Sequence, residues 1–181
     1  VTGTLTLESA VDAGSGNVTL YATGLIEQKA AGDIFTTSGT IDVESTAGAI
    51  TMNDGAIAQT NGGNIRYKAN GTVTIGLLDA RTSADRGEAT STDDKRDDQI
   101  KTTGGWGSVS IVSTGSSILD NSEDTVDVYA NELKLTATPA GVGAVGESTN
   151  HLEIEVAKVS ANVGSAGMFI TESTDITVGQ T

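Results

Sequence analysis

Residues 39–52 read GTIDVESTAGAITM, and the order of residue types in this stretch decides the fold class. Aliphatic and polar residues alternate, first around Ile41 and Val43 and again around Ile50 and Met52. Alternation with a period of two is typical of a β-strand with one buried face. A glycine stands before each run, where it favours a tight turn. The stretch therefore predicts two short strands joined by a turn.

The same pattern recurs along the chain and predicts a solenoid. Its clearest copies are GNVTLYATG at 16–24, GTIDVESTAG at 39–48, GNIRYKANG at 63–71 and GSVSIVSTG at 107–115. The leading residue of each successive run, weaker continuations included, is Val18, Ile41, Ile65, Val109, Leu133 and Ala157. The steps between these residues are 23, 24, 44, 24 and 24. A fixed period of this length is the mark of a stacked repeat.

Two further runs complete each period. The second run is exemplified by GAITM at 48–52 and GTVTI at 71–75, and its last copy is GMFI at 167–170. The third run begins with Val11, Ile34, Ile57 and Leu78 and continues with VDVY at 126–129, LEIEV at 152–156 and DITV at 175–178. The chain is therefore expected to form an all-β solenoid of about seven coils, with 23–24 residues and three short strands per coil. Coils about 4.8 Å apart would make a rod about 35 Å long.

Helical folds fit this sequence poorly, because glycine and threonine interrupt every window in which apolar residues could follow a helical spacing. A β-sandwich is the competing interpretation. It would need hairpin pairing, and it would not predict a constant step along the chain.

Composition limits the partners and the compartment. The 10 basic and 24 acidic side chains give a net charge of −14, which opposes binding to nucleic acids and anionic membranes. There is no cysteine, so disulfides and thiolate metal sites are excluded. No apolar stretch approaches the roughly 18 residues of a membrane-spanning helix, so membrane insertion is not expected.

Residues 1–181 are interpreted as a single solenoid segment. The runs VTGTLTL and TDITVGQT make both ends strand-like, and an uncovered coil exposes unpaired sheet edges. We therefore expect a segment of a longer protein, or copies that stack end to end, with neighbouring coils or copies as partners.

The repeats resemble those of filamentous-haemagglutinin-type exoproteins, the large bacterial adhesins exported by two-partner secretion. The likeness spans nearly the whole chain and is carried by GNVTLYATG, GTIDVESTAGAITM, GSVSIVSTGSSILDN at 107–121, VDVYANELKLTATPAGVGAVGESTNHLEIEV at 126–156 and MFITESTDITVG at 168–179. The resemblance implies a right-handed parallel β-helix, an extracellular, secreted or cell-surface location, and adhesion or a stalk role. It implies no catalytic residues.

Residues 81–105 account for the one step that is about 20 residues too long, and they predict a protruding insertion. Its charged centre and the tryptophan that follows are the candidate recognition residues: Asp93, Asp94, Lys95, Arg96, Asp97, Asp98 and Trp106. A plain solvated loop is the competing interpretation. Calcium binding fits less well, because the acids lack EF-hand spacing and two cations lie among them. Trp106 either stacks on a sugar or covers the coil where the insertion ends.

Turn aspartates complete the set of candidates: Asp33, Asp54, Asp79 and Asp120. Stacked carboxylates can form the acid pair of a glycan-cleaving enzyme, but capping of tight turns is the favoured interpretation. His151 is the only histidine, which excludes a histidine metal site. No catalytic, metal or cofactor-binding residue is therefore predicted, and an enzyme is not expected.

The sequence favours a structural and adhesive module of a large extracellular bacterial surface protein that displays binding loops to host or microbial glycans or proteins. Two alternatives stay open. One is a self-assembling filament or surface-layer subunit, and the other is a carbohydrate-active β-helix such as a lyase, hydrolase or tailspike.

Overall fold

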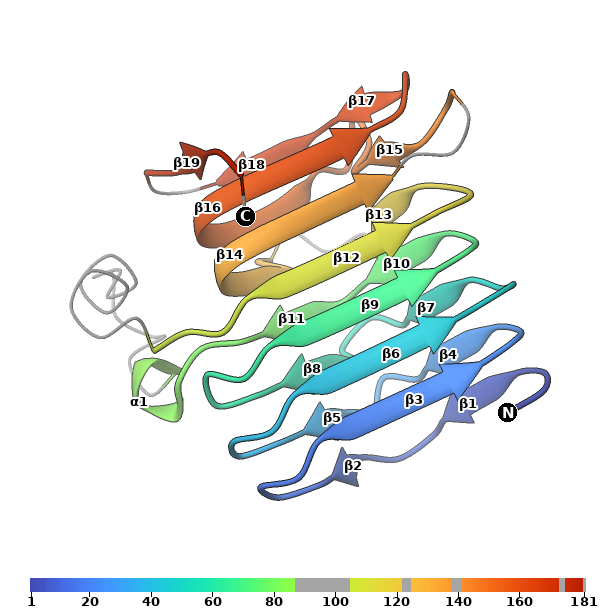
Figure 1. The fold of residues 1–181 in the computed structure, drawn as a ribbon, viewed down its shortest axis with the longest axis vertical. Helices are drawn as coiled ribbons and strands as arrows, with labels where there is room; N and C mark the ends of the chain where they lie inside the picture. Colours follow the sequence, from blue (N-terminus) through green and yellow to red (C-terminus); the bar gives the residue numbers. More distant parts are fainter. Residues whose placement is uncertain (87–104, 122–124, 138–140, 173–174, 181) are drawn as a thin grey trace.

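The chain folds into a right-handed parallel β-helix, as the sequence predicted, with about six turns where about seven coils were expected (Figure 1). The computed structural model describes residues 1–86, 105–121, 125–137, 141–172 and 175–180. The chain rises from the N-terminus at the bottom of Figure 1 to the C-terminus at the top, and all named strand pairs are parallel.

Three faces make up each turn. Face A consists of β1 (Leu5–Leu7), β4 (Ile26–Gln28), β7 (Ile50–Met52), β10 (Val73–Ile75), β13 (Ile118–Asp120), β15 (Ala144–Val145) and β17 (Gly167–Met168). Face B begins with β2 (Val11–Asp12), β5 (Ile34–Phe35), β8 (Ile57–Gln59) and β11 (Leu77–Asp79), and ends with β18 (Ile170–Glu172). Face C begins with β3 (Val18–Ala22), β6 (Ile41–Ser45), β9 (Ile65–Ala69) and β12 (Val109–Ser113), and ends with β19 (Thr177–Val178).

Two long strands, β14 (Val128–Ala137) and β16 (Leu152–Val163), each span faces B and C. The first part of β14 pairs with β11 on face B, and its second part pairs with β12 on face C. The expected three strands per coil are therefore found in the early turns, whereas the corner between faces B and C is absorbed into one continuous strand in the fifth and sixth turns. The helix α1 (Ser83–Arg86) is a single short turn.

The register confirms most of the repeat and corrects its end. Ile65 pairs with Val109 across the long step, as expected. Leu133, however, pairs with Val159 and not with Ala157. Ala157 lies opposite Asn131, at the junction of the two faces, while the larger Val159 is 1% exposed and fills the interior position.

The seventh coil is incomplete. Its strands β17, β18 and β19 have two, three and two residues. The run DITV was assigned to the third strand of a coil, but Thr177 and Val178 pair with the face C part of β16. The step from Val159 to Val178 is only 19 residues, so this last turn is shorter than the repeat predicts.

The interior is a column of stacked aliphatic side chains. Ile41, Ile65, Val109 and Leu133 follow one another on face C, and each is at most 1% exposed. Tyr67 lies in the same interior, as its position in the repeat predicted, and donates a hydrogen bond of 2.9 Å to Gln28 Oε1. Complete burial raises the pKa of the Tyr67 phenol, so this donor stays protonated.

The glycines that open the face C strands stand where successive turns touch. A Cβ on Gly39 would lie 1.9 Å from the Gly16 carbonyl oxygen, and one on Gly63 would lie 2.0 Å from that of Gly39. One on Gly107 would lie 2.1 Å from the Gly63 oxygen. The repeated glycine therefore reflects close backbone approach between turns.

This close approach makes a testable prediction for glycine-to-alanine substitutions. We expect Gly63→Ala to lower stability by about 1–3 kcal/mol, since the methyl group has to displace backbone of the turn below. Gly16→Ala is the matched control, because its Cβ would meet only Ala13 O at 3.1 Å. Thermal unfolding followed by circular dichroism measures both variants, and equal losses at the two positions would contradict the stacking explanation.

Candidate functional site

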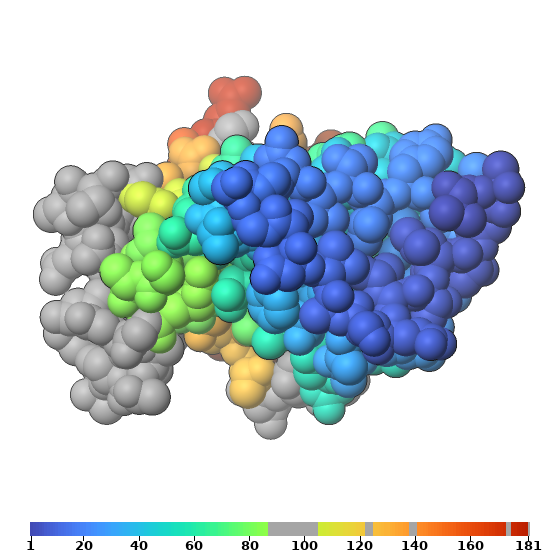
Figure 2. All heavy atoms as spheres, turned by 90° about the horizontal axis from the view of Figure 1, so that it is seen from below, coloured from blue at the N-terminus to red at the C-terminus, as the bar shows by residue number. Residues whose placement is uncertain are grey.

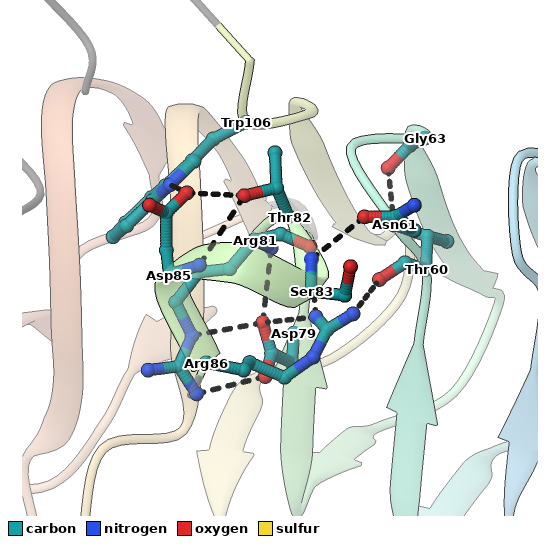
Figure 3. A network of polar contacts seen from close by, with 10 residues as sticks. All are labelled: Thr60, Asn61, Gly63, Asp79, Arg81, Thr82, Ser83, Asp85, Arg86 and Trp106. Carbon is teal, nitrogen blue, oxygen red and sulfur yellow. Dashed lines mark hydrogen bonds and ion pairs between the residues drawn. The ribbon is translucent and has the colours of Figure 1, made fainter. Parts of the chain in front are cut away.

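The insertion leaves and rejoins the β-helix at a compact, buried root. After β11 the chain turns through α1, and Gly107 N donates a 2.9 Å hydrogen bond to Ala80 O where the insertion ends. Around this point lies a group of side chains that we call the root cluster, and it consists of Thr60, Asp79, Arg81, Thr82, Asp85, Arg86 and Trp106 (Figure 3). The site therefore holds together two segments separated by the whole insertion.

Asp79 is the centre of the root cluster. Its carboxylate is 1% exposed and accepts from Arg81 Nε at 3.0 Å and Arg81 Nη2 at 2.8 Å. Arg86 Nη1 donates to the same carboxylate at 3.2 Å, and Arg86 Nη2 donates to Thr60 O at 2.6 Å. One buried carboxylate thus holds two guanidinium groups, so removing the acid leaves the buried Arg81 and the partly buried Arg86 without their anionic partner.

Trp106 closes the root from the other side. Its indole Nε1 donates to Asp85 Oδ2 at 2.6 Å, and the Thr82 hydroxyl contacts the same carboxylate oxygen. The ring is 5% exposed and meets Tyr129 edge-on with centroids 6.5 Å apart. Arg81 Cζ lies 3.5 Å from the Tyr129 ring centroid, a cation–π contact. Trp106 therefore covers the coil, which was one of its two expected roles, and its buried ring offers no open face for a sugar.

The charged centre of the insertion, Asp93, Asp94, Lys95, Arg96, Asp97 and Asp98, lies outside the described residues, so its recognition role stays a prediction.

The turn aspartates have separate structural surroundings. Asp33 Oδ1 accepts the backbone N–H of Ile57 in the next turn at 2.9 Å, which is a bond between coils and not the expected cap of its own turn. Asp79 makes the expected cap, because its Oδ1 accepts the backbone N–H of Arg81 at 2.9 Å. Asp54 is exposed, Asp79 belongs to the root cluster, and Asp120 lies in a different group of acids. The structure does not bring these four residues together.

That second group is the carboxylate cluster, defined here as Asp120, Asp127 and Glu153. One oxygen from each residue lies within 4.8 Å of the others, and this is the group among the described residues that could hold a metal ion. Asp120 ends β13, Asp127 precedes β14, and Glu153 lies near the start of β16. Sequence reasoning missed the cluster because only Asp120 stood out as a turn residue, while its partners follow in the next strands of face B.

Burial governs the protonation of this cluster. Burial, and after it the nearby charge of Asp120, raise the pKa of Asp127 to about 9, although the Glu153 backbone N–H that donates to Asp127 Oδ2 acts in the opposite direction. Asp127 is 1% exposed. Without a cation, the carboxyl of Asp127 therefore carries a proton at neutral pH.

The outer surface of face C carries a charge ladder of two rungs, in which Asp42 and Glu44 on β6 lie under Arg66 and Lys68 on β9. Arg66 bonds both oxygens of Asp42 at 2.8 and 2.9 Å and also reaches Glu44 at 2.8 Å. Hydrogen bonds from Lys68 and Arg66 lower the pKa of the Glu44 carboxyl, and the bond to Asp42 raises that of Arg66. An open groove beside this ladder is lined by Asn64, Ser108, Ser110, Glu132 and Lys134 among others. These contacts pair opposite charges between the turns of β6 and β9.

No family model, curated protein or solved structure matches the chain. Among the described residues, no helix has the length and apolar character needed to cross a bilayer. Functional proposals for this chain therefore rest on its own residues.

The root cluster predicts that Asp79 matters far more than an exposed acid. We expect Asp79→Ala to lower the free energy of unfolding by about 3–5 kcal/mol, because the buried Arg81 and the partly buried Arg86 lose their carboxylate. Asp42→Ala breaks a partly exposed ion pair with Arg66 and should lower the free energy of unfolding by at most about 1 kcal/mol. Thermal unfolding measures the loss, and emission from Trp106, the only tryptophan, should shift to the red only in Asp79→Ala. Unchanged emission in both variants would contradict a role for Asp79 in holding the root.

The raised pKa of Asp127 predicts a specific dependence of stability on pH in the presence of EDTA. The folded state holds a proton that the unfolded state releases near its ordinary pKa of 3.8. Stability contributed by this group is therefore fully present below about pH 4 and falls as pH rises toward 9. Asp127→Asn should flatten this fall, so the melting temperature of the variant should change less between pH 5 and pH 9. Equal slopes for the two proteins would show that Asp127 ionises normally.

Proposed function

We propose that the chain is a structural and adhesive module of a large extracellular bacterial surface protein, in which the β-helix is the stem and the insertion is the binding element. The fold supports the stem role, because parallel turns bonded to one another form a stiff column. The resemblance of the repeats to those of exported adhesins supports the location. The partners of this module are glycans or proteins on a host or microbial surface.

The root cluster is the observation that carries the display role. A merely solvated insertion needs no buried support. This one begins and ends on Asp79, Arg81, Asp85 and Trp106, which are each at most 9% exposed, and on Arg86, which forms an ion pair with the 1% exposed Asp79 carboxylate. Buried ion pairs contribute little net stability and are best understood as fixing geometry. The cluster therefore holds the entry and exit of the insertion in a defined place on the stem.

The position of the root also suits display. Seen from the N-terminal end, helix α1 lies at the side of the stack and not on the turn that faces the viewer (Figure 2). A partner that approaches from the side meets this region without competing with coils that stack along the axis. Lateral presentation is what a stem with binding loops requires.

The enzyme alternative receives less support from the described acids. Asp33 accepts a hydrogen bond from the backbone N–H of Ile57 in the next coil, and Asp79 is occupied by two guanidinium groups. Neither carboxylate is placed to act as an acid or base on a bound glycan, which would need a second carboxyl roughly 5–10 Å away across a groove.

Deleting the insertion tests the display role. A variant in which a short Gly-Ser linker replaces residues 87–104 should keep the melting temperature of the parent within a few degrees, since the interior column and the root cluster are untouched. The fluorescently labelled parent should bind to a glycan array or to coated host-matrix proteins, and the deletion variant should lose that binding.

Two controls sharpen this experiment. Asp79→Ala keeps the whole insertion but loosens its root, so it should bind more weakly than the parent at a temperature where both are folded. Asp42→Ala should bind like the parent. Binding that survives the deletion would place the adhesive surface on the stem, and polysaccharide cleavage by the parent would favour the enzyme alternative.

A further inference from the structure

The carboxylate cluster lies at the corner between faces A and B, where two successive turns meet. Asp127 N donates to Glu153 O at 2.8 Å, and Glu153 N donates to Asp127 Oδ2 at 2.8 Å. These bonds place the two acids side by side on adjacent turns. Asp120 reaches the same corner from the end of β13, so three separate segments of the chain contribute one carboxyl each.

The spacing of the three carboxyls suits one bound ion. Calcium binds oxygen at about 2.3–2.6 Å, so two of its ligand oxygens are separated by at most about 5 Å. The three oxygens of the cluster lie within 4.8 Å of one another, and no main-chain movement is needed to bring them around one ion.

A second observation points to a ligand at this corner. Asp127 is 1% exposed, and its Oδ1 receives no hydrogen bond from any of the described residues. A buried carboxyl oxygen without a donor is costly unless a ligand or a cation satisfies it. The carboxamide of Asn121, next to Asp120, is in the same condition, since both its Oδ1 and its Nδ2 are buried and accept or donate no bond within the described part of the chain.

We propose that Asp120, Asp127 and Glu153 form a binding site for a hard divalent cation of the calcium type. The donor set consists of carboxylate oxygens, which calcium and magnesium prefer and zinc does not. The chain has no cysteine and a single histidine, His151, whose ring stacks on Phe169 and bonds to Thr171. The larger, more flexible coordination sphere of calcium favours it over magnesium at a site built from three separate segments of the chain.

The bound ion would join the fifth and sixth turns. Asp120 and Asp127 belong to the turn of β13 and β14, and Glu153 belongs to the next turn, on β16. An ion held by both turns binds the folded state and not the unfolded chain, so it raises the melting temperature as its concentration increases. This site is independent of the insertion and of the proposed adhesive role.

Calcium titration of the intact chain tests the proposal. After treatment with EDTA and dialysis, calorimetric titration with CaCl2 at pH 7.5 in 150 mM NaCl should show one saturable site, and 5 mM CaCl2 should raise the melting temperature by several degrees. Asp127→Asn and Glu153→Gln should each weaken calcium binding at least tenfold. Both changes keep the side-chain shape, so both variants should fold, and circular dichroism spectra check this.

Asp54→Asn is the matched control, because it removes one exposed acid elsewhere on the stem. It should keep the saturable site and the temperature shift of the parent, which separates specific binding from general screening of a net charge of −14. The proposal is overturned if no saturable site is measured, or if calcium shifts the parent, Asp127→Asn and Asp54→Asn equally. In either case the cluster holds a proton and no ion.

Discussion

Backbone stacking between successive turns is the constraint on which the rest of this structure depends. In parallel register each residue lies over its equivalent one turn earlier, about 4.8 Å away. Aliphatic residues therefore meet aliphatic residues inside, as Ile41, Ile65 and Val109 do. Where two turns come closest, as at Gly39 and Gly63, the same constraint excludes any side chain. The aliphatic and glycine positions recur in the sequence because this geometry recurs from turn to turn.

Stacking also decides which charges can stand in neighbouring turns, because like charges in register repel one another. The outer surface of face C obeys this rule, since Arg66 lies over Asp42 and Lys68 lies over Glu44. At the corner of faces A and B the rule is broken, because Asp127 and Glu153 lie in neighbouring turns with Asp120 beside them. Three carboxyls this close together at a buried corner favour a proton or a cation between them.

The sequence predicts the fold wherever local alternation and the period agree. Both fail near the end, where Ala157 fitted the period but Val159 fills the interior, and where β15, only two residues long, was not anticipated. The burial of Trp106 was foreseen as one of two roles. The ion pairs of Asp79 with two arginines were not foreseen. A carboxylate at a turn is equally compatible with simple capping, and only the path of the chain shows which cations reach it.

The root cluster separates the length of the insertion from the geometry of the stem. Hydrogen bonds between Gly107 and Ala80, and between Trp106 and Asp85, bring the two ends of the insertion together at the root itself. From there Val109 enters face C in register with Ile65, whatever number of residues lies between. Lengthening a loop whose ends are already fixed costs little free energy, about 0.6 kcal/mol for each doubling. Because β14 runs straight across this corner in the next turn and places Tyr129 against Arg81, the following coil supports the root from above. The stem can thus carry insertions of different length and sequence at this corner without changing its own register.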